Sequence, residues 1–222
     1  SLSGEAMSQQ DIKLQKMDII VLGASGHAKV VIDLIEKQGQ FLIAGLIDDN
    51  PALSGQDICN YKVLGNTEEL KFQNVKQCVV AIGDNRVRND VEHWLTMNGF
   101  SLAKAIIHPS VQLAQGVSIG DGSVAMAGSV VNSDTVIANN TIINTGATID
   151  HDCTIGNAVH IAPGSTICGG VSVGDLTLIG AGAVICPNVK IGKNVIVGAG
   201  ATVLQNVADN VSVVGTPAKV IS

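Results

Sequence analysis

Aromatic residues are scarce in this chain of 222 residues, where three Phe, one Trp and one Tyr make up 2% of the sequence. This composition is poor for the core of a β-sandwich and suits a narrow fold that is filled with Ile and Val. A basic footprint is also missing, since 13 Lys and Arg stand against 19 Asp and Glu. No apolar run reaches the roughly 20 residues of a membrane span, and no secretory signal is visible. We therefore expect a protein that binds neither nucleic acid nor a membrane.

Metal-binding cysteine patterns are absent as well. The five cysteines are Cys59, Cys78, Cys153, Cys168 and Cys186. No CxxC pair predicts a zinc site, and the cysteines lie in apolar segments. We interpret them as reduced, small core residues of a cytoplasmic protein, and we expect no metal.

The pattern along the chain changes twice, which predicts three segments. Residues 1–16 resemble a cloning tag or a disordered leader and carry no fold argument. Residues 17–106 alternate between strand and helix patterns, and residues 107–222 are repetitive. Strands are expected at Asp18–Leu22, Phe41–Ile47 and Val75–Ile82, and helices at Ala28–Gln38, Gly65–Leu70 and Arg86–Asn98. This alternation with short connections predicts a small Rossmann-like α/β domain with helices on both faces of a parallel sheet.

Seventeen consecutive six-residue units fill the second half of the chain. Sixteen of the seventeen positions counted in steps of six from Ile107 to Val203 are Ile, Leu or Val. Four residues after each comes a small or β-branched residue. An unbroken period of six predicts a triangular parallel β-helix in which three units form one coil. We expect the tail from Val211 to Ile221 to leave this prism and fold back along it.

One histidine in the repeats has the surroundings of a general base. His151 stands between Asp150 and Asp152, and an unperturbed imidazole pKa of about 6.5 suits proton removal at neutral pH. A carboxylate on one ring nitrogen would set the tautomer. Side chains of adjacent strand residues point to opposite faces, so Asp152 reaches the His151 ring only if the pair lies at a corner. A solvated polar corner without a role is the alternative.

The N-terminal segment carries a second group of candidates. Gly23-Ala-Ser25-Gly26-His27 follows the first strand and resembles a phosphate-binding turn, although it is not GxGxxG. Acidic side chains that end the second strand can accept from a ribose or a base. Further candidates follow the third strand, where a guanidinium could neutralise a diphosphate. We expect sugar-nucleotide contacts from Gly23, Ser25, Gly26, His27, Asp48, Asp49, Gly83, Asn85 and Arg88.

These motifs together resemble the NeuD/PglD-type sugar acyltransferases, which belong to the left-handed β-helix acyltransferases. The resemblance covers nearly all of residues 18–221. Its marks are Gly23-Ala-Ser-Gly-His-Ala-Lys29, Asp48-Asp49, Ala81-Ile-Gly-Asp-Asn-Arg86 with Arg88, Asn144-Thr-Gly-Ala-Thr-Ile-Asp-His-Asp152, His160, and Gly215-Thr-Pro-Ala-Lys219. It implies a homotrimer that uses acetyl-CoA and holds a nucleotide sugar in the N-terminal domain. PglD-like members acetylate the 4-amino group of a UDP-sugar, so the resemblance favours UDP.

The resemblance also implies roles for single residues. It favours Asp152 as the partner that orients His151, and it places His160 at the acetyl-CoA end. It implies that the Gly169 N–H binds the thioester carbonyl. Asn144 either faces the acceptor, orients His151 or stacks in an asparagine ladder. Small residues that could leave a groove for the pantetheine arm are Gly180, Ala181 and Gly198.

Three other functions compete with this interpretation. O-acetylation of sialic acid, as in NeuD relatives, uses the same base. A non-catalytic sugar-nucleotide sensor or assembly subunit would not need His151. A zinc-dependent carbonic anhydrase on the same prism needs three histidines, but the repeats from residue 113 onward contain only His151 and His160. These two lie nine residues apart, or half a coil, so they do not easily share a cleft within one chain but can line one across a subunit boundary.

Overall fold

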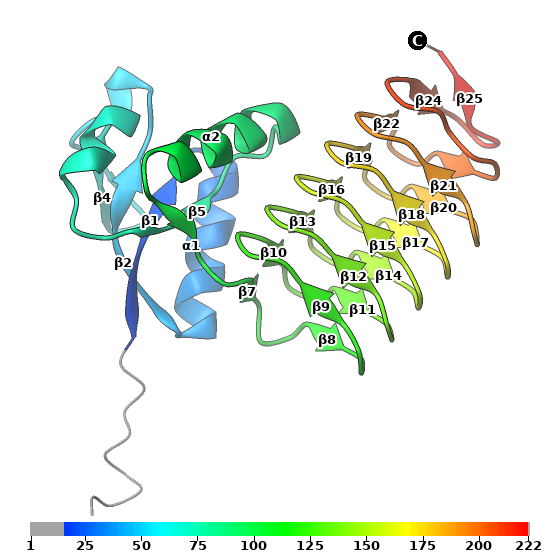
Figure 1. Cartoon of the computed structure of the whole chain (residues 1–222), viewed down its shortest axis with the longest axis horizontal. Coiled ribbons are helices and arrows are strands. Elements are labelled where there is room, and N and C mark those ends of the chain that lie inside the picture. Colours follow the sequence, from blue (N-terminus) through cyan, green and yellow to red (C-terminus); the bar gives the residue numbers. More distant parts are fainter. Residues whose placement is uncertain (1–15, 222) are drawn as a thin grey trace, which may run out of the picture.

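The computed structural model describes residues 16–221, and it consists of an N-terminal α/β part followed by a β-helix (Figure 1). The tag or leader expected at residues 1–16 lies, apart from Lys16, outside the described residues. The predicted fold class, a Rossmann-like domain in front of a β-helix, is confirmed.

The N-terminal sheet has the strand order β3-β4-β2-β1-β5-β6, and all of its pairs are parallel except β3 with β4. Its strands are β1 (Met17–Leu22), β2 (Phe41–Ile47), β3 (Asp57–Ile58), β4 (Tyr61–Gly65), β5 (Gln77–Val80) and β6 (Ser101–Leu102). Its helices are α1 (Gly26–Gln38), η1 (Pro51–Leu53), η2 (Thr67–Phe72) and α2 (Asn85–Met97). The predictions missed β4, which is short and carries only one fully buried hydrophobic side chain, Val63.

The two helices α1 and α2 cover opposite faces of the sheet. The buried side of α1, with Ala28, Val31 and Ile35, shares one hydrophobic cluster with Val124 and Ile142 of the β-helix. Helix α2 and η2 pack on the other face with Ile20, Cys78 and Leu95, among others. Because α1 is covered by the sheet and by the first coils, burial of apolar area joins the two parts.

Seventeen two-residue strands build the β-helix, one for each predicted unit. They are β7 (Ile106–Ile107), β8 (Gln112–Leu113), β9 (Ser118–Ile119), β10 (Val124–Ala125), β11 (Val130–Val131), β12 (Val136–Ile137), β13 (Ile142–Ile143), β14 (Thr148–Ile149), β15 (Thr154–Ile155), β16 (His160–Ile161), β17 (Thr166–Ile167), β18 (Ser172–Val173), β19 (Leu178–Ile179), β20 (Val184–Ile185), β21 (Lys190–Ile191), β22 (Ile196–Val197) and β23 (Thr202–Val203). Each pairs in parallel with the strand 18 residues away, as Ile143 does with Ile161. Together with β24 (Ser212–Val214) and β25 (Lys219–Val220), which follow in the C-terminal tail, they form faces of eight, six and five strands.

The prism interior is filled from two positions of the repeat, the aliphatic position and the small or β-branched position four residues later. Ile143, Ile161 and Ile179 are fully buried, and so are the hydroxyl residues Thr141 and Thr177. The Thr141 hydroxyl donates to the Gly156 carbonyl at 2.8 Å and accepts from the Val159 N–H at 3.2 Å. The Thr177 hydroxyl likewise donates to the Gly192 carbonyl and accepts from the Val195 N–H, so these threonines find both partners on the next coil.

The C-terminal tail differs from the prediction. The last coil is two residues shorter than the others, because Ile196 pairs with Ser212 instead of a residue 18 positions on. Strand β24 (Ser212–Val214) therefore continues the eight-stranded face, and only β25 (Lys219–Val220) turns back antiparallel to it. The expectation that the chain leaves the prism at Val211 is wrong, because the backbone of β24 still completes the ladder of β22.

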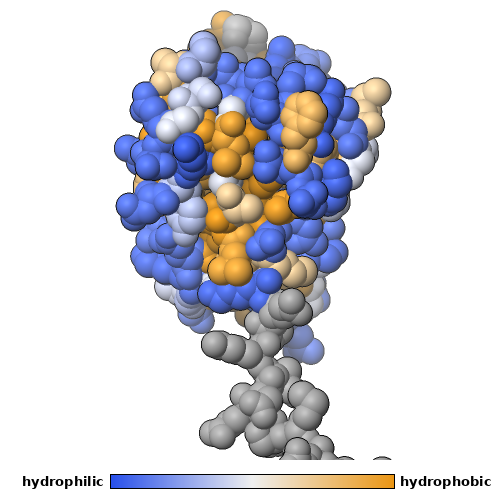
Figure 2. Space-filling model, turned by 90° about the vertical axis from the view of Figure 1, so that its left-hand side faces the viewer, coloured by the Kyte–Doolittle hydropathy of each residue, from blue (hydrophilic) through white to orange (hydrophobic). Residues whose placement is uncertain are grey.

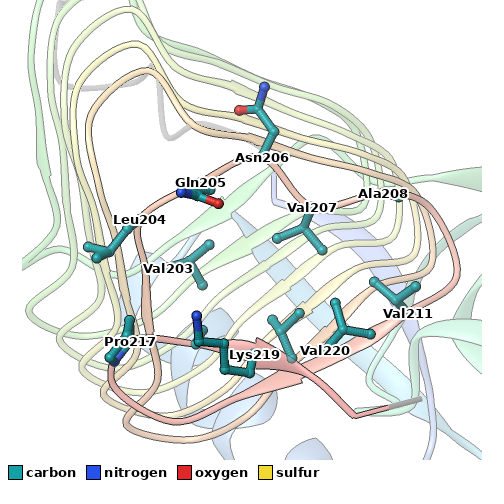
Figure 3. Close-up of a pocket in the computed structure, with 12 residues that line it drawn as sticks. Val203, Leu204, Gln205, Asn206, Val207, Ala208, Val211, Pro217, Lys219 and Val220 are labelled. Atoms are coloured by element: carbon teal, nitrogen blue, oxygen red, sulfur yellow. The ribbon is translucent and has the colours of Figure 1, made fainter.

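This end of the prism has a cavity of about 540 Å³ (Figure 3). Val203, Val207, Val211 and Val220 line it, and Lys219 is a charged side chain at its edge. No candidate site residue lines it. The cavity reflects the missing next coil, which elsewhere covers the aliphatic interior.

The outer end of the N-terminal domain has a mixed surface, with hydrophobic side chains gathered amid polar ones (Figure 2). The exposed large hydrophobic residues of this domain include Met17, Leu42, Phe72 and Met97. Within residues 16–221, no helix has the length and apolar character needed to cross a membrane.

Candidate functional site

His151 lies in the turn between β14 and β15, at a corner of the prism that we call the His151 corner. Asp152 follows it with φ +57°, a left-handed conformation that bends the chain back on itself. The pair therefore meets on one side, and the His151 Nδ1 lies 2.7 Å from the Asp152 Oδ2. His151 and Asp152 do lie at a corner of the prism, and the predicted contact between their side chains is confirmed.

Asp150 serves the turn itself. Its Oδ1 accepts from the His151 N–H at 2.9 Å and from the Asn132 Nδ2 at 3.0 Å. The hydrogen bond to Asp152 raises the pKa of His151, and the charge of Asp150 adds to this effect. A carboxylate only accepts, so Nδ1 carries the proton and Nε2 of the neutral ring is left as the basic nitrogen.

Gly169 lies one coil above His151 at the same corner. A Cβ at this position would stand 2.7 Å from the His151 Nε2, so the ring fits only against a glycine. Within residues 16–221, the Gly169 N–H donates to no backbone or side-chain acceptor, whereas its carbonyl accepts from Asn188. A basic nitrogen and an unused N–H donor are thus neighbours, as acyl transfer requires.

A second cluster lies in the crease between the domains. His160 points outward from β16, and its Nε2 is 3.0 Å from the Asn144 Nδ2. The ring of His27, from the first turn of α1, is 6.4 Å from the His160 ring. The Asn144 amide contacts His160 and its Oδ1 accepts from the Thr145 N–H at 2.8 Å, so within one chain Asn144 is the partner of His160 and not of His151.

Burial keeps both histidines of this cluster neutral. Burial, with the charge of Arg88 as the second cause, lowers the pKa of His27 to about 4 and that of His160 to about 4. Within the described part of the chain, the buried Nε2 of His27 has no hydrogen-bond partner. At neutral pH the cluster therefore presents uncharged imidazoles that can accept or donate.

We expect acid to destabilise the protein through these two rings. Their folded pKa of about 4 lies below the ordinary 6.5, so the unfolded chain binds protons first as the pH falls. The stabilisation is complete above pH 6.5 and is lost toward pH 4. The melting temperature should fall by several degrees between pH 7 and pH 5. His27→Gln should make the melting temperature depend less on pH, and the exposed control His93→Gln should not. An equal pH dependence in both variants would contradict the assignment of this effect to the buried imidazoles.

The predicted glycine turn is assembled by the second strand. The Gly23 N–H donates to the Ile47 carbonyl at 2.7 Å, and the Ala24 N–H donates to the Asp48 Oδ2 at 2.8 Å. Helix α1 starts after Ser25, whose side chain makes no capping hydrogen bond. The exposed Ser25 and Gly26 thus leave a helix N-terminus that can face an anion.

The two acidic residues after β2 differ in the atoms they leave free. Both oxygens of Asp48 are used, since its Oδ1 accepts from the Asn50 N–H at 2.9 Å. Asp49 uses only Oδ1, which accepts from the N–H and the hydroxyl of Thr67, each at 2.7 Å. Asp49 is therefore the better ligand partner, and Asp48 mainly holds the turn.

Arg88 and Asn85 are not placed as predicted. Arg88 is 1% exposed, and its guanidinium donates to protein acceptors in both domains, which leaves no place for a diphosphate. The Asn85 amide donates to the Leu176 and Thr177 carbonyls, both at 3.1 Å. The sequence did not predict these contacts between the two domains, because the acceptors of Arg88 and Asn85 in the β-helix are backbone carbonyls 52 to 92 positions away along the chain.

The remaining candidates lie at a different corner from His151. Gly180, Ala181 and Gly198 follow β19 and β22 at the corner that also carries Asn144, which we call the Asn144 corner. A Cβ on Gly180 would meet the Ala199 nitrogen at 2.5 Å, so this corner is tightly packed. A small cavity of about 170 Å³ between the domains is lined by Gly83, Asp84, Asn85, Arg86, His160, Leu176, Leu178, Asn194 and Ile196.

Within residues 16–221, no group of three His, Cys, Asp or Glu side chains is placed to hold a metal ion. The predicted residues are thus spread over several places within one chain. His151, Asp152 and Gly169 occupy the His151 corner, whereas Gly83, Asn85 and His160 line the domain crease. The turn after β1 and the two acids after β2 form a further group in the N-terminal domain.

Two family models match the chain in the order of its domains. The PglD N-terminal domain matches residues 18–95. The bacterial transferase hexapeptide model, of six repeats, matches residues 134–169, 152–187 and 170–205.

Solved structures match almost the whole chain. PerB from Caulobacter crescentus, in complex with CoA and GDP-perosamine, is 39% identical, with 92% of this chain and 97% of that chain covered and a TM-score of 0.87. The acetyltransferase domain of PglB from Neisseria gonorrhoeae, in complex with acetyl coenzyme A, is 33% identical, with 93% and 100% covered and a TM-score of 0.86.

A curated relative matches over a shorter stretch. UDP-N-acetylbacillosamine N-acetyltransferase from Bacillus subtilis is 33% identical over 112 residues, which are 50% of this chain. This match spans about half of the relative, 51% of its length.

Proposed function

The chain belongs to the NeuD/PglD-type family of hexapeptide-repeat sugar acyltransferases, and from this premise we propose that it transfers an acetyl group from acetyl-CoA to the amino group of a nucleotide-linked amino sugar. One observation carries the proposal. His151 is tied to Asp152 through Nδ1 and has its free Nε2 beside the unused N–H of Gly169.

In the proposed reaction the sugar amine attacks the thioester carbonyl carbon. Nε2 of His151 takes the proton that the nitrogen loses as the new C–N bond forms. The Gly169 N–H stabilises the oxyanion of the tetrahedral intermediate. The C–S bond then breaks, and the proton on Nε2 passes to the sulfur, so coenzyme A leaves as a thiol. Asp152 stabilises the imidazolium between these steps.

We propose a homotrimer in which neighbouring prisms form the cleft. The His151 side chain is 59% exposed in the single chain, and the His160 crease and the Asn144 corner lie on other sides of the prism. A three-fold axis would bring the His151 corner of one subunit toward the crease of the next, where His160 and the small residues of the Asn144 corner would contact acetyl-CoA.

The N-terminal domain is the proposed holder of the sugar nucleotide. The diphosphate would lie at the N-terminus of α1, near Ser25, Gly26 and His27, where N–H groups and the helix dipole favour an anion. The free oxygen of Asp49 would accept from the ribose or the base. We propose UDP as the nucleotide. GDP is the alternative, because the Caulobacter relative is in complex with GDP-perosamine.

Release of coenzyme A thiol from acetyl-CoA tests this function. We expect turnover with a UDP-4-amino-sugar or with GDP-perosamine, and none with free sialic acid. Turnover with sialic acid alone would instead support O-acetylation. Nucleotide binding without any thiol release would support a non-catalytic sugar-nucleotide sensor and would contradict the proposed acetyltransferase activity. Sedimentation should give three times the chain mass of 22.8 kDa, and full activity of separated single chains would contradict the shared cleft.

A further inference from the structure

Arg88 is the largest polar side chain that the fold buries completely. It belongs to the first turn of α2, is 1% exposed and lies where the N-terminal domain meets the β-helix. Its Nε donates to the Asn140 carbonyl at 2.8 Å, and its Nη2 donates to the Ala158 and Val159 carbonyls at 2.9 and 3.2 Å. These three acceptors are on two successive coils of the β-helix.

The other half of the guanidinium holds the loop between β5 and α2. Nη1 donates to the Ile82 and Gly83 carbonyls at 3.0 and 3.2 Å, and Nη2 also donates to the Asn85 Oδ1 at 2.7 Å. The Asn85 amide in turn donates to carbonyls of the next coil. The guanidinium thus connects two coils with the loop between β5 and α2, and Asn85 connects this loop with a third coil.

Only arginine fits this position. Its rigid fork offers donors in fixed directions, which a lysine ammonium cannot reproduce. Burying the charge is costly, and no carboxylate is hydrogen-bonded to the guanidinium in the described structure. Glu92, one of the two acids whose charge acts on Arg88, accepts from the Asn140 amide at 2.7 Å instead. Burial lowers the pKa of Arg88 to about 10, so the side chain is still charged at neutral pH.

These contacts end next to the residues of the crease. Val159 directly precedes His160, and Gly83 lines the same cavity as His160. Around the two imidazoles, the charged groups are Arg88 itself and, beside it, Asp84 and Glu92. Displacing Arg88 would therefore move the loop, the strand that carries His160 and the spacing between His160 and His27.

We propose that Arg88 is a positioning residue for acyl transfer: it locks the β5–α2 loop onto the coil edges and holds His160 and His27 at their spacing across the domain crease. The proposal rests on the proposed function only in taking this crease as part of the acetyl-transfer cleft. It takes Arg88 out of direct substrate binding and makes the domain joint itself a determinant of activity.

Two substitutions separate the charge of Arg88 from its geometry. Arg88→Lys keeps the charge but loses the fork, so we expect kcat/KM to fall at least tenfold while the pKa of His160, followed by NMR of the imidazole, stays low. Arg88→Met loses both, so the same loss of activity should come with a rise of the His160 pKa, because the charge of Arg88 is, after burial, the second cause that lowers it. Added guanidinium at non-denaturing concentration should partly restore Arg88→Met.

The control is Lys104→Ala, which removes an exposed ion pair with Asp121 beside the same joint and should leave activity and His160 unchanged. Full activity of Arg88→Lys would overturn the proposal. For Arg88→Met, a loss of activity that is proportional to the loss of folded protein, together with an unchanged His160 pKa, would also overturn it. If Arg88→Met does not fold, Arg88→Lys alone decides. The NMR reading needs no turnover, so failure of the proposed chemistry would leave it interpretable.

Discussion

His151→Ala lowers kcat by about 10²–10⁴ and leaves the dissociation constant of acetyl-CoA nearly unchanged, if His151 is the general base. The reason is local: alanine removes Nε2, the basic nitrogen beside Gly169, while the turn keeps the hydrogen bonds of Asp150. Steady-state kinetics and titration calorimetry measure the two quantities. An unchanged kcat would remove His151 from the mechanism.

The pH dependence sharpens this expectation. The base must be neutral, so kcat rises with pH as His151 loses its proton, and the contact with Asp152 places that rise above the ordinary imidazole pKa. Asp152→Asn should move the rise to lower pH, because it removes the charge that favours the imidazolium. The exposed control His93→Ala should leave the profile unmoved. A profile unchanged in Asp152→Asn would contradict the role of this pair.

Gly169→Ala lowers kcat by about 10–10³ through displacement of one ring. The added Cβ would stand 2.7 Å from Nε2 and 2.8 Å from Cε1 of His151. The backbone N–H is retained, and the atoms that must move belong to a half-exposed side chain, so the melting temperature should change little. Loss of activity without loss of stability, measured side by side, is the expected result.

A double-mutant cycle shows whether the methyl group acts through the ring. In the His151→Ala background the Cβ meets no imidazole, so Gly169→Ala should cost almost nothing further. An equal loss of activity in both backgrounds would place the effect of Gly169 elsewhere, for example in binding of the pantetheine arm.

The local features of the fold could be predicted because they repeat. Every aliphatic position from Ile107 to Val203 is the second residue of a short strand, and the glycine turn lies between a strand and a helix as its pattern predicts. The contact of His151 with Asp152 was predictable too, because it joins neighbours and required only a corner.

The tail and the domain joint could not be predicted in this way. The shortened last coil depends on which residue completes the ladder of β22, and the acceptors of Arg88 are backbone carbonyls that carry no side-chain signature. The same holds for Asn144, whose partner His160 comes from the next coil.

Repeat period and neighbouring motifs thus specify the prism, its corner and the candidate base, since these depend on residues close in sequence. Packing of the two domains decides that Arg88 is a buried clamp and that His27 and His160 are neutral neighbours. The physical reason is that burial and hydrogen bonds between distant segments arise only when the chain is folded, and they then set both the position and the charge of a side chain.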